Sequence, residues 1–161
     1  MSRIVFSSMT RREVSGVLLA AVVSVGCAAT RLVAFADIAA AETSRHTGGP
    51  ALIVAGTESA RATMASLRPG MTFPEGVVLV AVFQGQQPTG GFTIRVTGIE
   101  RSGERLIVHV ILTKPLDNAF VTQSLTSPLH VVSISHSDAS GLRDAVLLDE
   151  TGAELARASV T

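Results

Sequence analysis

The stretch VVLVAVFQGQQPTGGF, residues 77–92, decides the fold. Its first seven residues are apolar at every position, which is typical of a central strand covered on both faces. In the loop that follows, Pro88 fixes one backbone angle, while Gly90 and Gly91 allow positive φ and the close approach of another backbone. Two interpretations remain open for this loop: a shaped connector between two sheets, or a loop that contacts a partner.

Residues 91–112 predict a pair of antiparallel strands. Phe92, Ile94 and Val96 alternate with polar residues, which indicates a strand with one buried face. The apolar positions change parity after Gly98, which predicts a β-bulge there. Ser102-Gly103 then has the composition of a tight hairpin turn that leads into a second strand over residues 105–112.

The rest of the chain adds further short strands. Residues 129–134 are strand-like, and residues 145–149 and 153–156 flank Glu150-Thr-Gly152 as a closing hairpin would. Short strands at regular spacing with turn signals between them predict an all-β protein. We expect a small β-sandwich or open barrel of about six to seven short antiparallel strands.

The segment before residue 77 predicts one short helix near the start of the folded part. Residues 51–55 form a short apolar run, and Thr57 is suited to cap a helix that carries Ala60, Met64 and Leu67 at helical spacing. Breaker pairs then separate this helix from the main domain. The predicted organisation is a signal segment at 1–27, a flexible tether at 28–50, a lead-in at 51–76 and a β domain at 77–161.

The first 27 residues have the pattern of an export signal. Three arginines precede an apolar core of about 10 to 13 residues, shorter than the roughly 20 that span a membrane. Gly26-Cys27 resembles the end of a bacterial lipobox, in which Cys27 becomes the lipidated N-terminal residue. Alternatively, Ala34-Phe-Ala36 is an A-x-A cleavage site for ordinary secretion, or the segment stays as an uncleaved anchor.

Composition and charge exclude several functions. Lys+Arg and Asp+Glu are balanced at 13 each, so no basic field would attract nucleic acid. The chain has no Trp and no Tyr, which argues against stacking on bases or sugars. Cys27 is the single cysteine, so a Cys-based zinc site and an internal disulfide are both excluded. We expect no cofactor and no metal.

Catalytic residues are equally poorly supported. The four histidines show no metal-ligand spacing, and the carboxylates fall where turn residues are expected. Ser133, Ser135, His136 and Asp138 are the residue types of a hydrolase triad, but neighbours on an extended chain point to opposite faces. The sequence therefore predicts a protein that is not an enzyme.

Two separated motifs with strands between them resemble the C-terminal domain of the PrcB family, non-catalytic subunits of bacterial surface protease complexes. The family pattern is a strand, a G-x-x-P-T-G-G-Tyr loop, a hairpin, and T-Q-x-L-T-x-P before a last strand. Phe92 replaces the usual Tyr, and Ser127 and Leu129 stand where aromatic residues are expected. The matching positions are Gly85, Pro88, Thr89, Gly90, Gly91 and Phe92 in the first motif, and Thr122, Gln123, Leu125, Thr126 and Pro128 in the second.

The resemblance implies a non-catalytic accessory protein of the cell envelope, anchored to the membrane through a lipid. Its partner would be another exported or envelope protein, with a surface protease as one candidate. The expected partner-contact loop is Gln86, Gln87, Pro88, Thr89, Gly90, Gly91 and Phe92.

The same loop also supports an alternative function. Chagasin-type inhibitors of cysteine proteases are small β-sandwiches that insert an N-P-T-T-G-Tyr loop into the cleft of the target. The residues from Gln87 to Phe92 are similar to that loop, although Gln87 and Gly90 depart from it. The chain has no R-P-W motif, because it contains no Trp.

Overall fold

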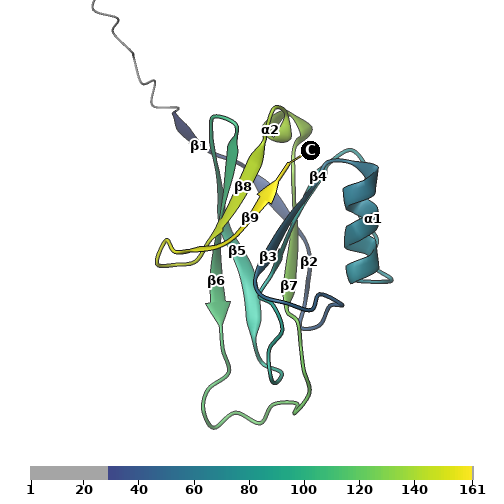
Figure 1. Ribbon diagram of the computed structural model, residues 1–161, viewed down its shortest axis with the longest axis vertical. Coiled ribbons are helices and arrows are strands. Elements are labelled where there is room, and N and C mark those ends of the chain that lie inside the picture. The colour runs from purple at the N-terminus through teal and green to yellow at the C-terminus, as the bar shows by residue number, and fades with distance from the viewer. Residues whose placement is uncertain (1–28, 161) are drawn as a thin grey trace, which may run out of the picture.

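Two β-sheets packed face to face form the body of the protein in the computed structural model, which describes residues 29–160 (Figure 1). One sheet has the order β1 (Thr30–Leu32), β5 (Thr93–Ser102), β6 (Arg105–Thr113), β8 (Asp144–Leu148), β9 (Glu154–Ser159). The other has the order β2 (Phe35–Ala41), β7 (Leu129–Ile134), β4 (Val78–Phe83), β3 (Ala51–Ala55). The predicted all-β class is confirmed, and the arrangement is a sandwich.

Strand β4 is the central strand that the sequence predicts. All six of its residues are buried. Its even-numbered side chains lie in the core between the sheets, and its odd-numbered side chains lie in a second core under helix α1 (Glu58–Leu67). Strand β7 pairs with β4 along its whole length and is also fully buried.

Helix α1 covers the outer face of the four-stranded sheet (Figure 1). Thr57 caps its N-terminus by accepting a hydrogen bond from the backbone N–H of Ala60. Met64 is 2% exposed and packs with Ala60 and Leu67 against the sheet. This confirms the predicted short helix, including its capping residue.

The β5–β6 hairpin also follows the prediction. Ser102 pairs with Arg105 across a two-residue turn, and Gly103 in that turn has φ of 60°. The register of the ladder shifts between Val96 and Gly98, which confirms the predicted bulge. This hairpin is the largest part of the five-stranded sheet.

One strand pair differs from the predicted antiparallel arrangement. Strand β8 lies parallel to β6, with Arg105 opposite Asp144. The chain crosses from β7 in one sheet through the short helix α2 (His136–Ala139) to β8 in the other. Because β8 arrives by a crossover and not by a hairpin, a tight turn does not impose an antiparallel direction.

The prediction of a flexible tether over residues 28–50 is wrong for residues 30–41, which include two strands. Strand β1 pairs with β5 and strand β2 pairs with β7, so this segment contributes one edge strand to each sheet. Val33, between the two strands, is 4% exposed and lies in the main core. The described residues therefore hold nine strands instead of six to seven, and the sandwich begins near residue 30 instead of 77.

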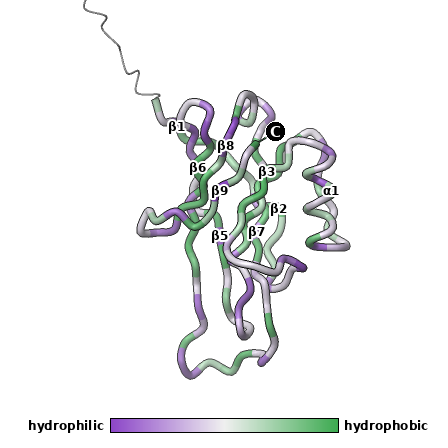
Figure 2. Tube along the Cα trace, viewed as in Figure 1, coloured by the Kyte–Doolittle hydropathy of each residue, from purple (hydrophilic) through white to green (hydrophobic). Residues whose placement is uncertain are grey.

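The sandwich has two unlike ends (Figures 1 and 2). We call the end with the β4–β5 connector (residues 84–92) and the β6–β7 connector (residues 114–128) the loop end. We call the end with the β5–β6 turn and α2 the hairpin end. Within residues 29–160, no helix is long and apolar enough to span a bilayer.

Candidate functional site

The two sequence motifs meet at the loop end. The backbones of Gln87 and Thr126 exchange two hydrogen bonds, of 2.8 Å and 3.0 Å, and form an isolated antiparallel bridge. The hydroxyl of Thr126 donates to the carbonyl of Thr89 at 2.7 Å. Gly90 N–H donates to the carbonyl of Thr122 at 2.9 Å. The β4–β5 connector is therefore held along its length by the β6–β7 connector.

The paired glycines of the first motif are explained by this contact. A Cβ on Gly90 would lie 3.0 Å from the Oγ1 of Thr122. Gly91 has φ of 83°, and a Cβ there would lie 2.9 Å from Pro115 and 3.0 Å from Val121. Any side chain at either position would press on the other connector, so the glycines allow the two loops to pack closely.

A third segment closes the other side of the loop end. Gln86 N–H donates to the carbonyl of Gly48 at 2.8 Å, and Ser127 N–H donates to the carbonyl of Glu42 at 3.2 Å. Gly85 lies so close to this segment that a Cβ would be 2.7 Å from the carbonyl oxygen of Gly48. Residues 42–50, also predicted as tether, thus pack against the first motif.

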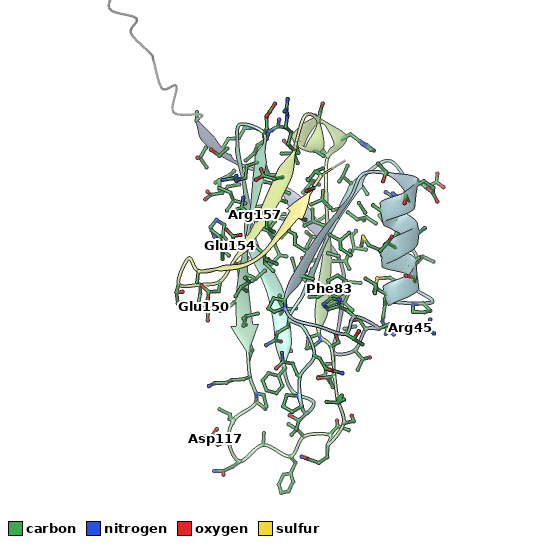
Figure 3. The ribbon with its side chains drawn as sticks, viewed as in Figure 1. Arg45, Phe83, Asp117, Glu150, Glu154 and Arg157 are labelled. Atoms are coloured by element: carbon green, nitrogen blue, oxygen red, sulfur yellow. The ribbon has the colours of Figure 1, made fainter. Side chains whose placement is uncertain are left out.

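This backbone network leaves large apolar side chains in solvent. Leu116 is 83% exposed, Leu125 is 65% exposed and Phe120 is fully exposed. All three lie on the β6–β7 connector, between the points where Pro115, Val121 and Thr126 hold it. We call Leu116, Phe120 and Leu125 the apolar tips. Figure 3 shows Asp117, a neighbour of Leu116, at the far tip of the molecule.

The predicted site residues divide into supported and projecting groups. Gln86, Pro88, Thr122, Gln123 and Leu125 are exposed, Gln87, Thr89, Gly91 and Phe92 are half-buried, and Gly90, Thr126 and Pro128 are buried. The first motif is thus a connector between the two sheets, as one of the two interpretations proposed. Its predicted contact with a partner stays a prediction, and Cys27 lies outside the described residues.

Sequence reasoning missed Leu116 and Phe120 as site residues. Both lie in a stretch rich in Pro, Asn, Thr and Ser, which has the composition of a loop. The available signal was their size: a large apolar residue in a long connector either folds back on the core or stays exposed for a contact.

The candidate triad residues have structural roles at the hairpin end. The hydroxyl of Ser135 accepts a hydrogen bond from the backbone N–H of Asp138 and donates to its carboxylate at 2.7 Å, which caps α2. Arg31 donates to the same carboxylate at 2.6 Å. These hydrogen bonds lower the pKa of Asp138. Among residues 29–160, no cluster of three or more His, Cys, Asp or Glu side chains is placed to hold a metal ion.

Comparison with known proteins gives one result that bears on identity. No curated protein and no solved structure matches the chain. A family model does match it, and the matched segment contains strands β4 to β7 with both connectors, just over a third of the sequence. The match confirms the resemblance drawn from the two motifs: residues 78–135 match the family model described as PrcB C-terminal.

Proposed function

We propose that this chain is a non-catalytic, exported accessory protein that binds another envelope protein through its loop end. One observation carries the proposal: the two family motifs pack into a rigid support that holds Leu116, Phe120 and Leu125 in solvent. Exposed aromatic and aliphatic side chains on a fixed backbone are the usual anchors of protein interfaces, because little conformational entropy is lost when they are buried.

The charges of the loop end favour a protein over a nucleic acid or an anionic membrane. The β4–β5 connector has no charged residue, and the β6–β7 connector has only Lys114 and Asp117. A surface that attracts phosphate groups carries several Lys or Arg side chains. A projecting loop with few charges and with apolar tips fits a concave apolar pocket on a partner protein.

The family match supports an accessory role in a protease complex. The partner we propose is therefore another exported protein, and a surface protease subunit is the first candidate. In this role the domain binds and stabilises its partner and carries out no chemistry itself.

We also propose that the protein is held at the membrane by a lipid on Cys27. Ordinary cleavage after Ala36 would remove strand β1, the core residue Val33 and the first two residues of β2. Burying Val33 contributes about 1 to 2 kcal/mol, and removing an edge strand exposes further core surface. Processing at Cys27 would keep every strand, so the fold favours that alternative.

The test compares apolar residues at the two ends of the molecule. Tagged full-length protein is used to capture partners from native envelope extract, and the captured protein is purified for affinity measurement. The Leu116→Ser/Phe120→Ser variant should bind the captured protein at least about thirtyfold more weakly, because truncating two anchors of an interface has this effect. Its melting temperature should match the parent, because neither side chain is buried.

Leu32→Ser is the matched control. Leu32 is also apolar and 80% exposed, but it lies on β1, which pairs with the hairpin-end half of β5. This variant should bind as the parent does. Equal losses in both variants would mean that capture depends on general hydrophobicity, and no loss in either would place the contact elsewhere. Gly90 is a poor position for such a test, because it is buried against Thr122.

A further inference from the structure

His130 is a buried histidine directly beneath the loop end. It is the second residue of β7, just after the β6–β7 connector, and only 2% of it is exposed. Opposite it, in the other sheet, lies Val96 of β5, the strand that follows the β4–β5 connector. The ring therefore lies between the two sheets, close to the points where the two connectors lead into β5 and β7.

The ring of His130 joins the sheets through a hydrogen bond. Its Nδ1 accepts from the backbone N–H of Val96 at 3.0 Å. Val96 precedes the β5 bulge, where the register of the β5–β6 ladder shifts. An acceptor at Nδ1 requires the neutral ring with its proton on Nε2. The hydrogen bond therefore exists only while His130 is uncharged.

Two charged side chains face His130. Asp37 of β2 lies with Oδ1 3.3 Å from Nε2, which carries the proton. Arg95 of β5 lies with Nη2 3.4 Å from the other carboxylate oxygen of Asp37. Asp37 and Arg95 are both about half exposed or more, so solvent reaches the outer side of this cluster while the ring stays buried.

We propose that His130 is an acid-released clip. The neutral ring joins β5 to β7 beneath the loop end through its hydrogen bond with Val96, and the protonated ring loses that hydrogen bond. The charged ring has two N–H donors and no acceptor. Nδ1–H would then face the N–H of Val96, donor against donor, while Nε2–H would pair more strongly with the carboxylate of Asp37. The ring thus exchanges a bond to β5 for an ion pair with β2.

The direction of the pKa shift sets the pH range of release. Burial lowers the pKa of His130 below that of an ordinary imidazole, Asp37 partly offsets this, and Arg95 adds to it. Because the unfolded chain then binds the proton more readily than the folded chain, the clip contributes fully above the ordinary pKa of about 6.5. The contribution falls as the pH drops below that value towards the lower pKa of the folded state.

The first test measures the protonation of His130 and its hydrogen bond with Val96 in the full chain without any substitution. Nitrogen-15 NMR of the His130 ring in detergent micelles should show an unprotonated Nδ1 at about pH 7.5, and protonation of that atom on acidification below the ordinary imidazole pKa. The protection factor of the Val96 amide, which is the intrinsic hydrogen-exchange rate divided by the measured rate, should fall at least about tenfold over the same pH range. A ring protonated at Nδ1 at neutral pH, or a Val96 amide equally protected at both pH values, would overturn the proposal.

A pair of variants separates the clip from the other histidines. In His130→Asn, the Oδ1 atom takes the place of Nδ1 as an acceptor that does not titrate. The melting temperature of the parent should fall by about 3 to 5 °C between about pH 7.5 and pH 5, as expected for one lost hydrogen bond. His130→Asn should lose most of this dependence. His136→Asn changes an exposed residue on α2 and should keep the pH dependence of the parent. If the melting temperature changed equally with pH in all three proteins, the result would contradict the clip.

The effect on binding rests on the proposed function, whereas the tests above do not. If the loop end binds a partner, acidification should weaken that binding in the parent and leave it unchanged in His130→Asn. A normal pH response of the ring and of the Val96 amide with no partner at any pH would contradict the proposed function alone.

Discussion

The two ends of the sandwich are stabilised by different interactions. At the hairpin end, short turns are tied together by ion pairs, which join Arg31 to Asp138, Arg105 to Asp144 and Arg143 to Glu104. At the loop end, none of the ion pairs among the described residues involves either connector, and backbone hydrogen bonds and glycine contacts hold the loops. Over residues 29–160, the hairpin end exposes one large apolar side chain, Leu32, whereas the loop end exposes Leu116, Phe120 and Leu125.

This difference supports the proposed contact at the loop end. Exposed charges keep a surface soluble, and surface ion pairs contribute little to stability. Exposed large apolar side chains carry a solvation cost that binding removes. Long connectors also need more support than tight turns, and the two family motifs provide it. Under the proposed function, the motifs support the surface that binds the partner and form little of that surface themselves.

The largest expected effect comes from a glycine at the loop end. Gly85 has φ of 88°, and a Cβ would lie 2.7 Å from the backbone of both Gly48 and Gly49. Gly85→Ala should lower the free energy of unfolding by about 3 to 4 kcal/mol, because left-handed strain and a backbone clash add together. Urea unfolding followed by circular dichroism measures the loss.

Gly141→Ala at the hairpin end is the control for this comparison. Gly141 has φ of 73°, but the nearest atom to its Cβ is the flexible tip of Arg101 at 3.7 Å. Its substitution should cost only the strain, about 1 kcal/mol. If both variants lost the same free energy, the backbone at residues 48 and 49 would yield easily, and the loop end would not be rigidly supported.

Local signals predicted the parts of the fold that depend on neighbouring residues. The uninterrupted apolar run of β4, the Ser102-Gly103 turn, the bulge at Gly98 and the Thr57 cap are all correct, because each rests on residues within a few positions of one another. The two family motifs could also be recognised from the sequence, because each is a short run of specific residues.

Long-range contacts account for what was missed. Strand β2 is rich in alanine and has no clear alternation, and it is a strand because β7, about 90 residues later, offers a paired edge. The bridge between Gln87 and Thr126 and the hydrogen bond from Val96 to His130 join residues far apart in sequence. No local pattern reports such pairs, so the loop end as a joined structure could not be predicted.

The melting temperature, measured as a function of pH, should show separate contributions from the two ends of the molecule. At the hairpin end, the hydrogen bond from Arg105 lowers the pKa of Asp144. A lowered carboxyl pKa adds stability above the ordinary pKa, and this stability is lost as the pH falls through and below about 4. The melting temperature should therefore decrease in two steps, one near the imidazole range from the loop end and one in the carboxyl range from the hairpin end.

Asp144→Asn assigns the second step. This variant should lower the melting temperature at neutral pH and reduce the step in the carboxyl range, while leaving the imidazole-range step unchanged. His130→Asn should reduce the step in the imidazole range and leave the step in the carboxyl range unchanged. The second step should shrink without vanishing, because the pKa values of Asp138, Asp149 and Glu154 are lowered as well. One continuous fall, altered equally by both variants, would mean that the two ends do not titrate independently.

The smallest effect is expected at the ion pair that fastens β1. Arg31 is half exposed, and its guanidinium lies 2.6 Å from the carboxylate of Asp138. Arg31→Gln should lower the free energy of unfolding by about 0.5 kcal/mol, as surface pairs do, and this loss should shrink at high salt. The loss in Gly85→Ala should not respond to salt, because steric overlap is not screened. A double-mutant cycle with Asp138→Asn gives the coupling, and a salt-independent value well above 1 kcal/mol would show that the hairpin end, like the loop end, is held by more than exposed charges.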